Sequence, residues 1–179
     1  MALAKKYKVN IDHQFGGKSR YVDIYCEGWG GSQSELTGTM EPGILDYPGS
    51  DNTIFDPIFG SELNVNVWNL SAEQLIEFAS ARNRDYLAIL VNDDNTIDEW
   101  MGWLLPGEVE EPWNQAPYET NLVFNCGLGL LDDDFLDTDG SYYTGRASLK
   151  DIIIDCLQKI YPSTVSGITR PPLRSHISS

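Results

Sequence analysis

Carboxylates are the side chains of this sequence best suited to chemistry, and the densest group lies in the segment DDDFLDTDG at residues 132–140. Calcium prefers several carboxylate oxygens on a flexible loop. An EF-hand does not fit, because Gly140 at the sixth loop position would put Phe135 first and Arg146 last, where carboxylates are required. We therefore predict a solvated acidic loop at residues 132–139 and assign no metal ligand, with cation binding as the open alternative.

Two adjacent carboxylate pairs, Asp98–Glu99 and Glu110–Glu111, raise the alternative of a glycosidase. Such an enzyme needs two carboxylates at a set separation across a sugar site, and neighbours in sequence do not by themselves converge. A carbohydrate-binding surface is a further alternative, since aromatic rings offer large apolar contact areas. The tryptophans are Trp29, Trp68, Trp100, Trp103 and Trp113. Packing in a core or an interface is the simpler interpretation of these rings.

Nucleophilic catalysis and cofactor binding find little support. His13 lies in an expected turn, His176 lies near the end of the sequence, and neither adjoins a GxSxG pattern. Gly127-Leu-Gly129 lacks the rest of a dinucleotide fingerprint and is interpreted as a turn. The cysteines are Cys26, Cys126 and Cys156. Because they are odd in number and show no CxxC spacing, we predict free thiols, buried at positions 26 and 156. No catalytic, cofactor-binding or metal residue is assigned, and we predict that the protein is not an enzyme.

The elements that would position these residues are mostly short strands. Apolar and polar residues alternate in several runs, and Leu63, Val65 and Val67 give the clearest inward face. Ser71 and Gln74 form a capping box, which begins a short helix to about Arg82. The expected strands are 6–11, 21–26, 35–39, 44–47, 62–67, 86–91, 97–105 and 118–124. Turn spacing predicts roughly seven to nine short strands in an antiparallel β-barrel or sandwich.

A second helix is expected near the end of the sequence. Ser148 caps it and Pro162 ends it. Its apolar stripe is Leu149, Ile152, Ile153, Cys156, Leu157 and Ile160. The predicted organisation is a β domain at 1–145, this amphipathic helix at 146–162, and an extended or mobile tail at 163–179.

Charge limits the choice of partners. The net charge is −15, which disfavours direct binding to DNA or to an anionic membrane. No basic residue occurs from Asp85 to Gly145, so this window forms either solvated loop tips or an acidic face for a basic neighbour. No apolar run is long enough to span a membrane, and the first residues lack the apolar run of a secretory signal. We expect a protein made in the cytoplasm.

Several segments resemble, in this order, a family of tail proteins encoded by tailed phages and prophages of Bacteroidetes. They are FDPIFGSELNVNVW, RDYLAIL, WMGWLLPGEVEEPW, the dipeptide Pro117-Tyr118, CGLGLLDD and YTGRASLKDIIIDCL. The resemblance implies a tail-tip component of the hub or baseplate kind that assembles into rings and has no catalytic residues. The motif positions that it implies are structural are Pro57, Gly60, Ser61, Glu62, Gly102, Pro106, Gly127 and Gly129.

One departure is the short sequence after SLKDIIIDCL, where the relatives continue much further, and this leaves hub, adaptor and stopper roles open. The function expected from the sequence is a structural virion protein of a phage tail, assembled in the host cytoplasm. It would form a homo-oligomeric ring or adaptor and contact other tail proteins. The alternative is a carbohydrate-binding β-sandwich for attachment to the host surface.

Overall fold

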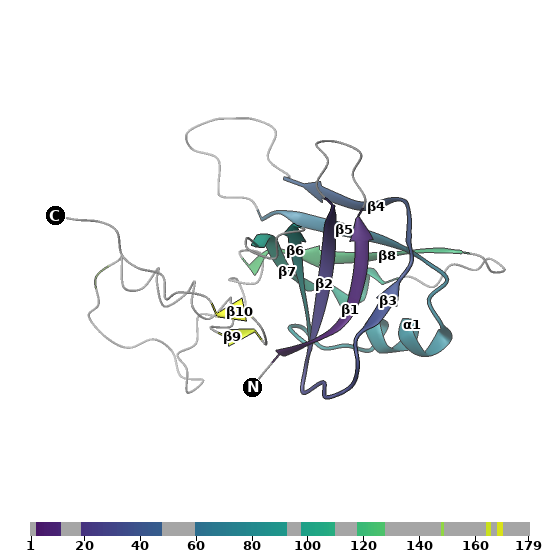
Figure 1. Ribbon diagram of the computed structural model, residues 1–179, viewed down its shortest axis with the longest axis horizontal. Coiled ribbons are helices and arrows are strands. Elements are labelled where there is room, and N and C mark those ends of the chain that lie inside the picture. The colour runs from purple at the N-terminus through teal and green to yellow at the C-terminus, as the bar shows by residue number, and fades with distance from the viewer. Residues whose placement is uncertain are drawn as a thin grey trace.

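The computed structural model of the protein describes residues 3–11, 19–47, 60–92, 98–109, 118–127, 148, 164–165 and 168–169. These residues are mainly β, as predicted, with one α-helix among them. The strands are β1 (Leu3–Ile11), β2 (Arg20–Glu27), β3 (Ser34–Leu36), β4 (Gly38–Asp46), β5 (Glu62–Trp68), β6 (Tyr86–Asn92), β7 (Asp98–Leu104), β8 (Glu119–Asn125), β9 (Thr164–Val165) and β10 (Ile168–Thr169). The helices are α1 (Ala72–Ala79) and the single 3-10 turn η1 (Pro106–Glu108) (Figure 1).

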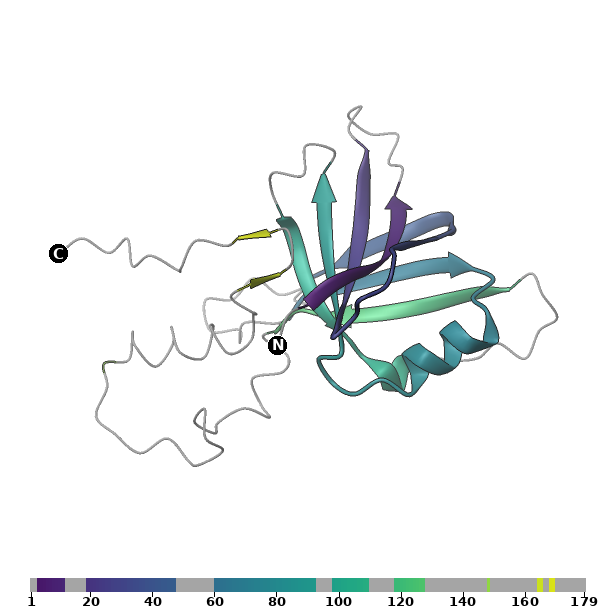
Figure 2. The same cartoon turned by 60° about the horizontal axis from the view of Figure 1, so that its bottom comes forward.

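All ten strands belong to one sheet, in the order β10-β9-β1-β2-β6-β7-β8-β5-β4, with β3 paired to β1 outside this path. The sheet bends sharply where β7 meets β8, because these strands pair only through Trp103–Asn125 and Leu104–Phe124. Figure 2 shows the result: β1, β2, β6 and β7 run across the direction of β4, β5 and β8, with α1 below them.

The bend brings β4 back towards β1. A Cβ added to Gly43 would lie 2.4 Å from Ile11 Cδ1, and one added to Gly38 would lie 3.2 Å from Asn10 O. A side chain at either position would crowd β1, so the two glycines favour this close approach. Directly before Gly38, the Thr37 carbonyl oxygen accepts a 2.8 Å hydrogen bond from Trp68 N. The described strands thus form a curled sheet. β4 is the last strand in its order, and strand pairing among the described residues does not close the sheet into a barrel.

The pairing of the strands differs from the prediction in one respect. The sheet is mixed and not purely antiparallel, because both β3 and β9 pair in parallel with β1. Residues 164–165 and 168–169, which lie in the expected tail, form the β9–β10 pair. Of the expected helix at 146–162, only Ser148 lies within the described residues, and it is exposed. Most of the FDPIFGS connection also lies outside them.

Apolar side chains are buried on both sides of the β1-β2-β6-β7 part of the sheet. The main core includes five side chains with 0% exposure, namely Val22, Ile24, Val65, Phe78 and Phe124, together with their buried neighbours. A second cluster lies on the opposite side and consists of Leu3, Tyr21, Tyr25, Leu87, Ile89, Val91, Met101 and Trp103. This explains why the Tyr86–Val91 run is apolar at every position, since both faces of this central strand are covered.

Helix α1 begins as its capping box predicts. Gln74 N donates to Ser71 Oγ at 3.2 Å, and Ser71 N donates to Gln74 Oε1 at 2.9 Å. Leu75 and Phe78 are buried, while Ile76 is 66% exposed. The helix therefore packs one side on the open end of the curled sheet and presents the other to solvent.

Candidate functional site

The carboxylate of Glu77, on the side of α1 that faces the sheet, accepts hydrogen bonds from three side chains. The donors are Lys6 Nζ, Tyr86 OH and, at 3.1 Å, Tyr7 OH. Lys6 and Tyr7 come from β1 and Tyr86 from β6, so the carboxylate joins the helix to two strands. The Phe78 ring packs between the rings of Tyr7 and Tyr86, with centroids 5.4 and 5.1 Å away, and fixes their positions.

The electrostatics of this cluster favour a fixed anion. Burial opposes ionisation of Glu77, but the hydrogen bonds from Lys6, Tyr86 and Tyr7 outweigh it and hold the pKa of the carboxyl below its usual value. Burial, followed by the neighbouring carboxylate, raises the pKa of Tyr7 and of Tyr86 above the ordinary phenol range. None of the three groups exchanges protons near neutral pH, so the arrangement is suited to holding elements together and not to acid–base catalysis.

A pocket of about 430 Å³ opens beside this cluster, between the end of β2 and the end of α1. It is lined by Cys26, Glu27, Glu77, Ser80, Ala81, Arg82, Asp85 and Tyr86. Cys26 is a free thiol, as predicted, but it is half-buried and not buried, because it lies beside the pocket where β2 ends. Cys126, also free, is buried.

The tryptophans are divided between packing and the surface. Trp100 and Trp103 on β7 are 8% and 5% exposed and point to opposite sides of the sheet, one into each apolar cluster. Trp29 lies under the Lys6 ammonium, 4.2 Å from its ring centroid. Trp68 is 36% exposed. The two rings of β7 are therefore unavailable to stack on a sugar, which weakens the carbohydrate-binding alternative; Trp113 lies outside the described residues.

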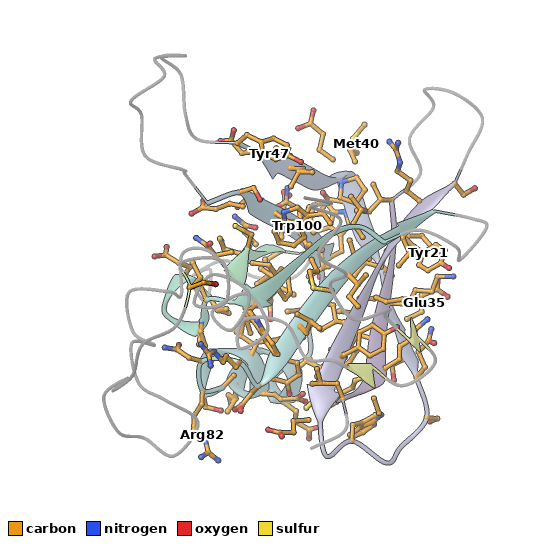
Figure 3. The ribbon with its side chains drawn as sticks, turned by 90° about the vertical axis from the view of Figure 1, so that its left-hand side faces the viewer. Tyr21, Glu35, Met40, Tyr47, Arg82 and Trp100 are labelled. Carbon is orange, nitrogen blue, oxygen red and sulfur yellow. The ribbon has the colours of Figure 1, made fainter. Side chains whose placement is uncertain are left out.

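Exposed apolar side chains gather on β4. Met40 is 98% exposed, Ile44 46% and Tyr47, directly after the strand, 67%; we refer to these three residues as the β4 patch. Figure 3 shows Met40 and Tyr47 at one end of the molecule, with Arg82 at the other. Register shifts between Gly38 and Gly43 interrupt the β4–β5 pairing, which leaves Met40 projecting from an irregular stretch. Such a group of apolar side chains on an edge strand is typical of a contact surface.

No protein-family model, curated protein or solved structure matches the chain. Within the described ranges, no helix is long and apolar enough to cross a membrane. The same residues include no group of three or more His, Cys, Asp or Glu side chains arranged to hold a metal ion. The acidic loop 132–139 lies outside them.

Little of the predicted acidic face falls within the described residues. Glu108 and Glu119 are exposed, as a solvated face requires. Asp85 stabilises the turn in which it lies, because its Oδ2 accepts a 2.7 Å hydrogen bond from Arg82 N. The carboxylate pairs 98–99 and 110–111 have no described side chains.

Two of the motif positions have clear structural roles. Ser61 is buried and contacts Trp100 and Cys126, and an added Cβ on Gly102 would lie 2.6 Å from Asn125 O. Local sequence patterns do not indicate Glu77 or the β4 patch as functional residues. Glu77 reads as an ordinary surface glutamate of an amphipathic helix. Pro42, within β4, was the available signal for an edge strand, because proline is confined to edges and bulges of sheets.

Proposed function

We propose that this protein is a structural subunit of a phage tail, acting as a ring or adaptor of the hub, baseplate or tail-tip kind in the virion. The β4 patch carries the proposal, together with the sequence resemblance to tail proteins. Fully burying a side chain such as Met or Ile stabilises an interface by roughly 1.5–3 kcal/mol. Exposing Met40, Ile44 and Tyr47 on one strand is costly for an isolated subunit and useful for one that associates.

The fold supports a role as a rigid scaffold. Apolar packing on both sides of β1, β2, β6 and β7, with α1 fastened through Glu77, supports a stable body whose edge strand is presented to a neighbour. We infer that the curled sheet acts as an open barrel, in which β3 and then β4 lie along the same edge of β1. A ring needs a heterologous contact, in which one surface of a copy meets a different surface of the next.

The test is the mass of the native assembly. Wild-type protein at micromolar concentration is expected to form a closed oligomer. The double variant Met40→Asn/Tyr47→Asn should be monomeric, because it loses the apolar contact without any change in charge. Ile76→Asn is the matched control: Ile76 is 66% exposed on α1, so its replacement should leave the mass unchanged.

A second measurement connects assembly to the virion. Particles purified from a host that produces the phage are expected to contain the chain. A wild-type protein that stays monomeric at every concentration tested, and that is missing from particles, would exclude the proposed function.

A further inference from the structure

The second half of β4 is an edge available for pairing. β4 is last in the strand order, and from Ile44 to Asp46 it pairs with Asn64, Leu63 and Glu62 of β5 on one side only, among the described strands. Alternate backbone N–H and C=O groups of an edge strand point away from its partner, which makes such an edge a template for an added strand. The exposed Ile44 and Tyr47 lie at this edge.

This edge also brings two negative charges together. Asp46 is exposed and lies directly opposite Glu62 in the β4–β5 register. Like charges directly opposite each other in a sheet are destabilising. Glu62 accepts a hydrogen bond of 3.3 Å from Asn125 Nδ2, which is a neutral donor and leaves both charges in place. A cationic side chain arriving at this end of β4 would relieve the repulsion.

The sequence itself contains a segment with the matching chemistry. Residues 170–179, RPPLRSHISS, hold Arg170, Arg174 and His176 and no Asp or Glu, in a chain of net charge −15. After the two prolines, Leu173 and Ile177 share one face of an extended strand, and Arg174 and His176 share the other. Ile44 and Asp46, two residues apart on β4, both lie on the outer side of the sheet, and Leu45 between them packs against the core on the inner side. The segment thus offers a basic face for Asp46 and Glu62 on the outer side and an apolar face for the inner side, where Leu45 lies.

The path of the chain favours a neighbour over the same copy. Residue 170 directly follows β10, and β9 pairs with β1 at Leu3. β4 approaches the other end of β1, at Asn10 and Ile11. The nine residues of β1 separate these points by about 26 Å at ~3.3 Å per residue. In strand order β10 and β4 are the two opposite ends of the sheet (Figure 1), so a head-to-tail contact between copies can repeat and close a ring.

We propose that the β4 edge of one copy receives residues 170–179 of a second copy as an added strand. Pairing begins after Pro172, because proline has no N–H to donate. Arg174 then lies on the outer face of the sheet beside Asp46 and Glu62. This inference rests on the proposed self-assembly, and it names the partner that the β4 patch receives.

A mixing experiment tests this arrangement in the full chain. Ser175→Pro disables the donor segment without changing charge, because it removes an N–H and disfavours strand pairing. Ile44→Asn/Tyr47→Asn disables the acceptor edge. Each variant alone should be monomeric. An equimolar mixture should give a 1:1 dimer and nothing larger, because only one functional donor and one functional acceptor remain.

A charge exchange tests the register. Arg174→Glu should raise the protein concentration needed for half-assembly roughly tenfold, and Asp46→Lys in the same chain should restore the wild-type value. Circular dichroism checks that each variant is folded.

The outcomes separate the two proposals. A Ser175→Pro protein that still forms the wild-type oligomer, or a mixture that remains monomeric, overturns the strand-addition proposal and leaves the assembly function standing. A wild-type chain that is monomeric because its own segment covers β4 would overturn both.

Discussion

Trp100 Nε1 donates a hydrogen bond of 2.7 Å to Ser61 Oγ, joining the middle of β7 to the residue that precedes β5. Ser61 also contacts Cys126, the residue after β8: Ser61 N lies 3.0 Å from Cys126 Sγ, and Cys126 N donates to Ser61 O at 2.8 Å. β7 and β8 pair over only two residues, so these bonds reinforce the sheet where strand pairing is weakest.

Replacing Ser61 by Ala should destabilise the protein by about 1–3 kcal/mol, because the buried indole N–H of Trp100 loses its acceptor. Urea unfolding measures this as a lower transition midpoint with an unchanged slope. Ser32→Ala, in an exposed stretch, is the control and should leave the midpoint where it was. Equal midpoints for the two variants would show that the Trp100–Ser61 bond contributes nothing to stability.

Gly102 should not tolerate a side chain. A Cβ there would lie 2.2 Å from Trp100 Cη2 and 2.6 Å from Asn125 O, and the backbone oxygen cannot move away without disturbing β8. We expect Gly102→Ala to cost about 1–3 kcal/mol in unfolding free energy. Gly107→Ala is matched to it, since nothing lies within 4 Å of a Cβ at Gly107. Thermal unfolding should show a lower midpoint for the first variant only; a comparable loss at Gly107 would point to backbone freedom and not to the close contact.

Glu77 should make stability depend on pH in acid. Its folded pKa lies below the ordinary value of 4.5, so its contribution is fully present above about pH 4.5 and is lost as pH falls through the folded pKa. Glu77→Gln should cost about 1–3 kcal/mol at neutral pH, because Lys6 and two phenols lose a charged acceptor. The difference between variant and wild type should then shrink as the pH is lowered below 4.5.

Glu73→Gln serves as the control for this measurement, because Glu73 is exposed on the same helix. Urea midpoints taken from pH 3 to pH 7 give the comparison. A Glu77→Gln difference that stays constant over the whole range would mean that ionisation of Glu77 does not stabilise the fold.

Local patterns predicted the strands and the first helix because each is determined by neighbours in sequence. The alternation of Leu63, Val65 and Val67 placed all three side chains in the core, at 1%, 0% and 0% exposure. The capping box at Ser71 set the start of α1. Both signals depend on residues only a few positions apart.

Contacts between distant residues could not be predicted in this way. Glu77 meets Lys6 and Tyr7 across separations of 71 and 70 residues, so nothing near position 77 indicates its partners. Tyr21 and Tyr25 alternate with Val22 and Ile24 along β2, and the alternation does not indicate that both faces are buried; the two tyrosines are 7% and 2% exposed because both sides of β2 are covered. The parallel pairing of β3 with β1 likewise depends on the bend of the whole sheet.

Lys5 Nζ forms an ion pair with Asp23 Oδ2 on the side of the sheet that carries the second apolar cluster, since Asp23 lies between Tyr21 and Tyr25 on β2. The Asp23 side chain is 2% exposed and that of Lys5 30%, so the carboxylate is the buried partner. Removing Lys5 alone costs more than replacing both side chains, because the buried Asp23 carboxylate then loses this opposite charge. Lys5→Met should therefore destabilise the fold by roughly 2–4 kcal/mol, and Lys5→Met/Asp23→Leu should recover most of that loss.

Lys8→Met is the matched control for this pair. Lys8 lies on the same strand, 4.1 Å over the Tyr21 ring, and makes no ion pair among those that the structure describes. Its loss should lower the free energy of unfolding by only about 0.5–1 kcal/mol, the value of an exposed cation–π contact. If the double variant were as unstable as Lys5→Met alone, the loss would come from the packing of the Lys5 stem and not from the buried charge of Asp23.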